Sequence, residues 1–245
     1  MKTCLLIAMS LALACCARTK PESAPQPKAF GTAITIVSGD KQLGTTGTAL
    51  PQSLVVQIND AEGNAVTGAP VSIQGANGAS ATPAVGLTDD SGQFTSTISM
   101  GETSGRYRIT ATSHDRAGKP LTIQTEEIAL GYQQTWGREL SATYCDRCHN
   151  PESTPERVSN YDNLSTKPHP FTEGAALNKL SDADLTAIIT HGGPALNNSP
   201  EMPPYGYTLS NVEIQALIAY IRALADPPYQ DAKRSMPTSL PSQRS

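Results

Sequence analysis

The chain of 245 residues lacks any apolar stretch of the roughly 18 residues that a membrane-spanning helix needs, so no internal transmembrane segment is expected. Charge is also scarce. Charged residues make up 16% of the chain and the net charge is −4, which argues against electrostatic binding of nucleic acid. No cysteine lies between residues 17 and 144, so this region has no disulfide framework. Aromatic residues make up only 5%, so any core must rest on aliphatic side chains.

The first residues have the pattern of an export signal. Lys2 is followed by an uncharged run over residues 5–14, which has the length of a signal-peptide core. The run ends at Cys15 and Cys16, preceded by small residues, and this resembles a bacterial lipoprotein cleavage box. We therefore expect residues 1–15 to be a lipoprotein signal peptide, with Cys15 lipidated and Cys16 as the alternative. A soluble secreted protein cut near Ala17 is the other interpretation, and both place the chain outside the cytoplasm.

Two proline-rich segments delimit the interior of the chain. Residues 16–29 contain three prolines and few apolar side chains, which predicts an extended linker. Residues 227–245 contain four prolines and scattered serines, which predicts a disordered tail. Two domains are expected between them, at 30–130 and 131–226.

Short β-type runs alternate with turn clusters in the first of these domains. One run places Leu54, Val56 and Ile58 on one face, and another points Tyr107 and Ile109 inward. This spacing predicts an all-β sandwich. The expected runs are 33–37, 54–58, 71–73, 94–99, 106–111 and 121–128.

Four motifs of this region carry a family resemblance. They are VSGD at 37–40, GTALP at 47–51, DAEGNAV at 60–66 and TDDSG at 88–92. Together they resemble the bacterial Ig-like repeats of the invasin and intimin type. The resemblance implies an Ig-like sandwich without its disulfide, serving as a spacer or an adhesive module.

The second domain contains the motif Cys145-x-x-Cys148-His149, whose established meaning is covalent haem attachment. Two thiols three residues apart on one helical turn can bond to two vinyl groups of one porphyrin, and the adjacent histidine can reach the iron. A thioredoxin-like redox motif would follow a strand, whereas a helix is expected here. A zinc site needs four ligands, and the chain has no second cysteine pair.

A sixth iron ligand has four candidates: Met202, His191, His169 and Met236. Met202 is favoured because prolines on both sides restrict its backbone, so little entropy is lost when it binds. His191 ends an expected helix, where the helix dipole alone accounts for a histidine. Met236 lies in the expected tail.

Three helices are expected around these residues. The first spans about 133–145, the second follows Ser181 and ends at His191, and the third follows Ser210 and runs to about residue 224. Each of the last two has an acidic residue three positions after its serine, the pattern of a capping box. They would build a haem pocket.

Residues 132–225 resemble a class I cytochrome c domain of the small bacterial monohaem type. In that family's pattern, Cys145 and Cys148 bind the haem covalently, His149 binds its iron, and Met202 is the distal ligand. The resemblance implies an all-α cytochrome c domain with one covalently bound haem c.

Two further positions match the family at the crossing of the first and last helices, and one departs from it. Gly137 matches the glycine where the helices meet, and Tyr220 matches the aromatic residue that packs there. The departure is Ser141, where the family often has an aromatic residue.

Ligation by histidine and methionine is typical of electron-transfer centres and fills both axial positions, so no enzymatic turnover is expected. The leading hypothesis is a membrane-anchored cytochrome, periplasmic or at the cell surface, with the Ig-like domain as a spacer. Its partners would be a redox donor and acceptor that contact an acidic haem domain, because residues 131–226 carry eleven acidic and six basic side chains. The alternatives are a haem-bearing subunit of a larger oxidoreductase and a cell-surface adhesion protein.

Overall fold

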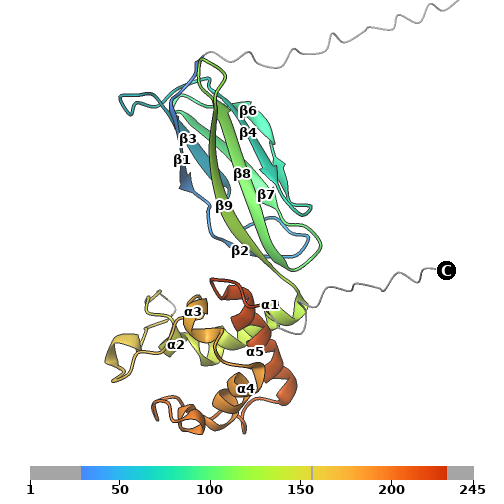
Figure 1. Ribbon diagram of the computed structural model, residues 1–245, viewed down its shortest axis with the longest axis vertical. Coiled ribbons are helices and arrows are strands. Elements are labelled where there is room, and N and C mark those ends of the chain that lie inside the picture. The colour runs from blue at the N-terminus through green and yellow to red at the C-terminus, as the bar shows by residue number, and fades with distance from the viewer. Residues whose placement is uncertain (1–28, 156, 231–245) are drawn as a thin grey trace, which may run out of the picture.

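The computed structural model describes residues 29–155 and 157–230 and divides them into two bodies (Figure 1). A β-rich part reaches to Leu130, and a helical part follows it. The predicted signal peptide, Cys15, Cys16 and most of the predicted linker and tail, including Met236, lie outside the described residues.

The β-rich part of the described chain is a sandwich of two sheets. One sheet has the strand order β1-β3-β7-β5, and the other has the order β2-β9-β8-β4-β6. Only β2 pairs in parallel, along β9, and the remaining pairs are antiparallel. All six predicted runs are strands. The three-residue strands β2, β5 and β6 were not predicted. The bounds are β1 Ala33–Ser38, β2 Leu43–Thr45, β3 Leu54–Asn59, β4 Pro70–Gly75, β5 Ser80–Thr82, β6 Val85–Leu87, β7 Gln93–Ser99, β8 Gly105–His114 and β9 Pro120–Leu130.

Alternation of apolar side chains forms the sandwich core. Leu54, Val56 and Ile58 on β3 are at most 1% exposed, as are Tyr107 and Ile109 on β8. Successive side chains of a strand point to opposite faces, so the residues between them are less buried. The inward faces predicted for both strands are therefore confirmed.

The described residues after Leu130 form helices as their regular structure. The two predicted capping boxes are present: the Ser181 hydroxyl accepts a hydrogen bond from the Asp184 backbone N–H at 3.1 Å, and Ser210 does the same for Glu213 at 3.4 Å. None of the helices described is long and apolar enough to span a bilayer. The helices are α1 Tyr132–Tyr144, α2 Asp146–His149, α3 Gly174–Leu177, α4 Asp182–His191 and α5 Asn211–Leu224, with short 3-10 turns at η1 Tyr161–Asn163 and η2 Gly193–Leu196.

The two bodies are joined directly. Strand β9 ends at Leu130 and helix α1 begins at Tyr132, with Gly131 between them as the N-cap (Figure 1). A second contact comes from Arg106 on β8, whose guanidinium donates to the carbonyl of Ala225 at 2.7 Å. The helical part thus meets the end of the sandwich at which β8 begins and β9 ends.

Candidate functional site

Both thiols and His149 lie on a single turn, formed by Cys145 at the end of α1 and the short helix α2 that follows it. Cys145 caps the end of α1, and its carbonyl accepts hydrogen bonds from the backbone N–H groups of Cys148 and His149, each at 3.0 Å. The two cysteines are half-buried and free. The predicted spacing therefore places both sulfurs and one imidazole on the same turn.

The environment of Cys145 favours a neutral thiol. Burial, with smaller contributions from Asp146 and Cys148, raises the pKa of the Cys145 thiol to about 12. A reactive redox thiol has the opposite property, because its pKa is lowered to favour the thiolate. Zinc also binds thiolates, and the described residues contain no group of three or more His, Cys, Asp or Glu side chains that could hold a metal ion.

The ring of His149 is held in a defined orientation. It stacks on Phe171, with ring centroids 4.7 Å apart and an angle of 27° between the planes. Its Nδ1 lies 3.3 Å from the carbonyl oxygen of His169. A carbonyl can only accept, so Nδ1 carries the proton and the Nε2 lone pair is free to bind a metal. Burial lowers the pKa of His149, which further favours this neutral form.

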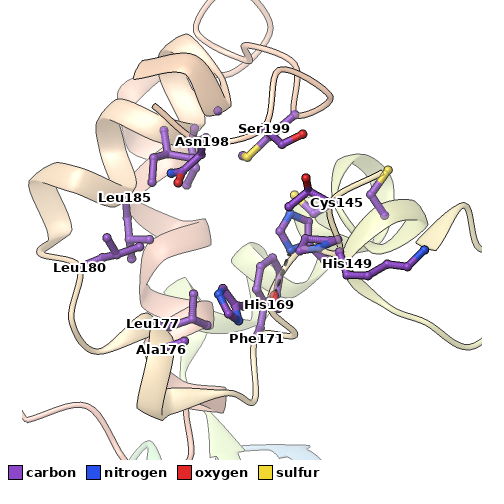
Figure 2. A pocket seen from close by; sticks show the side chains of 18 of the residues that line it. Cys145, His149, His169, Phe171, Ala176, Leu177, Leu180, Leu185, Asn198 and Ser199 are labelled. Atoms are coloured by element: carbon purple, nitrogen blue, oxygen red, sulfur yellow. Dashed lines mark hydrogen bonds between the residues drawn. The ribbon is translucent and has the colours of Figure 1, made fainter. Parts of the chain in front are cut away.

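These residues open into an apolar cavity of about 650 Å³. In Figure 2, Cys145 and His149 lie on one side of it, and Leu180 and Leu185 on the opposite side. The volume lies in the range of cofactor and ligand sites, roughly 300–1,000 Å³. The aliphatic part of the wall is formed mainly by Leu164, Leu177, Leu180, Leu185, Ile188 and Ile189.

Met202 lines the same cavity from a loop between η2 and α5. Its carbonyl accepts a hydrogen bond from the Gly193 backbone N–H at 3.1 Å. Only a glycine fits at position 193, because a Cβ there would lie 2.0 Å from the carbonyl oxygen of Ser199, which belongs to the same loop as Met202. Three residues after Met202, the Tyr205 N–H donates to the Ile189 carbonyl of α4 at 2.9 Å. The loop is therefore fastened to the start of η2 at Met202 itself and to α4 three residues later.

The other predicted ligands are placed differently. His191 is exposed at the end of α4 and does not line the cavity. His169 does line it, but its carbonyl holds His149 and its own Nδ1 lies 2.9 Å from a carboxylate oxygen of Glu173. Met236 is outside the described residues. Met202 is thus the methionine that the described chain brings to the cavity.

Ser141, the departure from the family pattern, has a polar role. It is fully buried at the end of α1, and its hydroxyl donates to the carboxylate of Asp146 at 2.7 Å. Asp146 directly follows Cys145, so the serine fastens the attachment turn to α1.

Burial, followed by the nearby Asp146 charge, raises the pKa of Tyr220 on α5 to about 12, so the phenol stays neutral.

Several contacts of the site were not predicted from the sequence. The hydroxyl of Tyr205 donates to the carbonyl of Tyr144 at 2.8 Å, which links the Met202 loop to the attachment turn. The carboxylate of Glu201 accepts hydrogen bonds from Ser165, whose hydroxyl is the main cause that lowers the Glu201 pKa to about 2. Proximity of these residues depends on irregular loops, for which the sequence has no periodic signal.

Residues 133–221 match the family model described as cytochrome c oxidase, cbb3-type, subunit III. This part of the chain is a cytochrome c family domain, which indicates a haem-bearing electron-transfer protein. No curated protein matches the chain at a significant level.

Solved structures of bacterial Ig-like adhesins resemble the N-terminal part. The D00-D0 domain of intimin is 18% identical, with a TM-score of 0.32, and the match covers 45% of this chain and 50% of that one. Invasin, a bacterial integrin-binding protein, is 24% identical with a TM-score of 0.31, and the match covers 40% of this chain and 19% of that one. The adhesin InvE of Yersinia pseudotuberculosis is 14% identical with a TM-score of 0.32, and the match covers 40% and 32%. The chain therefore spans half or less of each of these structures.

Proposed function

We propose, from the cytochrome c family domain at residues 133–221, that the chain is a monohaem c-type cytochrome that passes electrons between redox proteins. The observation that carries this proposal is the convergence of two thiols, the His149 imidazole and the Met202 thioether on a single apolar cavity. Each of these groups has a role in holding a haem, and the helical part would have the all-α cytochrome c fold.

The residues present fit such a group. Cys145 and Cys148 would hold it through thioether bonds, and the neutral thiol of Cys145 is the form that adds across a vinyl group. His149 would bind the iron through Nε2, because the carbonyl of His169 keeps the proton on the Nδ1 of His149. Met202 would bind the opposite side.

A haem bound in this way supplies a one-electron couple, and histidine with methionine ligation raises its potential. The chain's own contribution would be to exclude water with aliphatic walls and to supply two ligands to the iron, His149 and Met202. With both bound, a substrate would find no open ligand position, so we propose electron transfer and no enzymatic turnover.

The surroundings of the haem domain suit transient protein partners. The excess of acidic side chains over residues 131–226 favours a donor or acceptor with a basic surface. Lipid on Cys15, or on Cys16, would hold the chain to a bacterial membrane after export. The sandwich would then separate the haem domain from that membrane, because the first described strand, β1, begins at the end of the sandwich away from the helices (Figure 1).

A second candidate is a haem-bearing subunit of a larger oxidoreductase. The description of the matching family model as an oxidase subunit favours it. Purification from native membranes separates the two, because a subunit would co-purify with a catalytic chain and a carrier would not.

The central experiment is the spectrum of Met202→Ala, produced as the full chain with haem maturation machinery. The variant should keep its covalent haem, lose the weak near-infrared band of ferric iron bound to methionine sulfur, and bind carbon monoxide when reduced. His191→Ala and Met236→Ala are the matched controls and should keep the wild-type spectrum. A wild-type spectrum for Met202→Ala would instead require a histidine as the sixth ligand.

A further inference from the structure

We propose that Glu201 is a positioning residue that holds the Met202 loop closed across the cavity. The inference rests on the proposed function, because it takes Met202 as the distal ligand. The loop has two kinds of attachment, and the one through Glu201 is made by a side chain that can be altered without changing the backbone.

The carboxylate of Glu201 reaches a segment 35 residues earlier in the chain. It accepts a hydrogen bond from the Ser165 hydroxyl at 2.7 Å, and the Ser165 backbone N–H lies 3.1 Å from both carboxylate oxygens. The Thr166 backbone N–H lies 3.3 Å from one of them. Thr166 and Leu164 line the cavity, as Met202 does. Glu201 therefore connects two separate parts of the cavity wall.

The segment that receives Glu201 is itself fixed. The ammonium of Lys167 donates to three backbone carbonyls, those of Tyr161, Asp162 and Leu164, at distances of 2.7–3.1 Å. The same ammonium lies 5.5 Å from the centre of the Tyr161 ring. The Glu201 carboxylate is thus bound to a segment that is already fixed, and this restricts the motion of the adjacent Met202.

The contact favours a carboxylate. The backbone N–H groups of Ser165 and Thr166 can only donate to Glu201, and a carboxylate is acceptor-only, whereas an amide brings two N–H donors. Glu201→Gln keeps the shape of the side chain, but its NH₂ group would replace one carboxylate oxygen and could not accept a hydrogen bond from these N–H groups. Glu201→Asp keeps the chemistry but shortens the reach. The two variants separate charge from length.

The test measures how often the sixth position opens in the haem-loaded full chain. Glu201→Gln should keep covalent haem, weaken the near-infrared methionine band, and bind carbon monoxide in the reduced state roughly three to ten times faster than wild type, since exposed charged hydrogen bonds have modest effects. Met202→Ala sets the upper limit of that rate. Glu201→Asp should lie between Glu201→Gln and wild type, and Glu139→Gln, an exposed charge on α1, should match wild type.

Ser165→Ala provides a second measurement that does not alter the ligand loop. It should raise the carbon monoxide rate less than Glu201→Gln does, and adding it to Glu201→Gln should raise the rate no further. Additive effects, or a Glu201→Gln variant with the wild-type rate and band, would overturn the role of Glu201. A wild type that already lacks the methionine band and binds carbon monoxide like Met202→Ala would instead overturn the proposed function.

Discussion

Gly137 on α1 lies directly against the backbone of Ala216 on α5. A Cβ added to Gly137 would lie 2.0 Å from the Ala216 carbonyl oxygen and 2.8 Å from the Cβ of Tyr220. These atoms belong to the backbone of Ala216 and to the Cβ of Tyr220, and they could move aside only if helix α5 itself shifted. The glycine that the family resemblance placed at this crossing is therefore required by the close approach of the two helices.

Gly137→Ala should destabilise the helical part. Replacing an exposed helical glycine by alanine raises the free energy of unfolding by up to about 1 kcal/mol, whereas overpacking lowers it by about 1–3 kcal/mol. The effect of the clash should be the larger one, so the free energy of unfolding should fall. Urea unfolding of the apoprotein, followed by the fluorescence of the single tryptophan on α1, measures this. Ala142→Ser adds one atom at an exposed position of the same helix and should be nearly neutral, while a stabilised Gly137→Ala would contradict the prediction.

Regular patterns made most of the fold predictable from the sequence. Strands β3 and β8 alternate buried residues with less buried ones along their length, and α4 and α5 each begin with a capping box. The cysteines and histidine of the attachment motif are close in sequence, so their meeting on one turn was also predictable. Each of these features is determined by residues within a few positions of one another.

The features that were missed depend on distant contacts. Strand β2 has three residues and is a strand only because it pairs with the end of β9. Likewise, Glu201 meets Ser165, and His149 meets the carbonyl of His169, across loops with no repeating pattern. Side-chain hydrogen bonds to the backbone determine these loops, and no spacing in the sequence indicates which partners will meet.

Glu127 should give the sandwich a distinctive pH dependence. Its side chain is 1% exposed, and its carboxylate accepts hydrogen bonds from the backbone N–H groups of Lys41 and Gln42 and from the Thr125 hydroxyl. Burial is the largest effect and raises its pKa, and the Asp40 charge acts in the same direction. The native state therefore binds this proton more tightly than the unfolded state does.

The sign of the effect follows from that difference. Between the ordinary pKa of a glutamate and the raised native value, stability falls as the pH rises, by up to about 1.4 kcal/mol per pH unit. Glu127→Gln should lack this component, so the difference in unfolding free energy between wild type and variant should change across that window. Urea unfolding at a series of pH values, followed by circular dichroism, measures the difference. The exposed Glu62→Gln should show no such change, and equal slopes for wild type and Glu127→Gln would refute the assignment.

The export signal predicts where the protein is found. Replacing both Cys15 and Cys16 by serine should move the protein from the membrane fraction to the soluble periplasmic fraction, because the lipid acceptor is lost while the apolar export run is kept. Cys4→Ser alters a cysteine that precedes the cleavage box and should leave the protein in the membrane fraction. Wild-type protein that is already soluble after export would rule out the lipid anchor.

Arg106 should control how firmly the sandwich holds the haem domain. Its side chain is 19% exposed, and its guanidinium pairs with Glu126 on β9 and donates to the carbonyls of Leu224 and Ala225 at 3.3 and 2.7 Å. These carbonyls end α5 and have no partner within the helix, so a cation there is favourable. The contact is worth about 1–2 kcal/mol, by analogy with other charge-assisted hydrogen bonds.

Arg106→Gln should therefore loosen the two bodies without unfolding either of them. Among the described residues, the junction at Gly131 and weaker surface contacts would then remain as links, so the bodies should sample more orientations. Small-angle X-ray scattering should show a broader distance distribution, while the unfolding temperature of each body stays close to that of wild type. Arg108→Gln removes the same charge from an exposed position two residues along β8 and should scatter like wild type. If Arg106→Gln also scatters like wild type, the direct connection of β9 to α1 fixes the orientation by itself, and the sandwich is a rigid spacer without the help of this arginine.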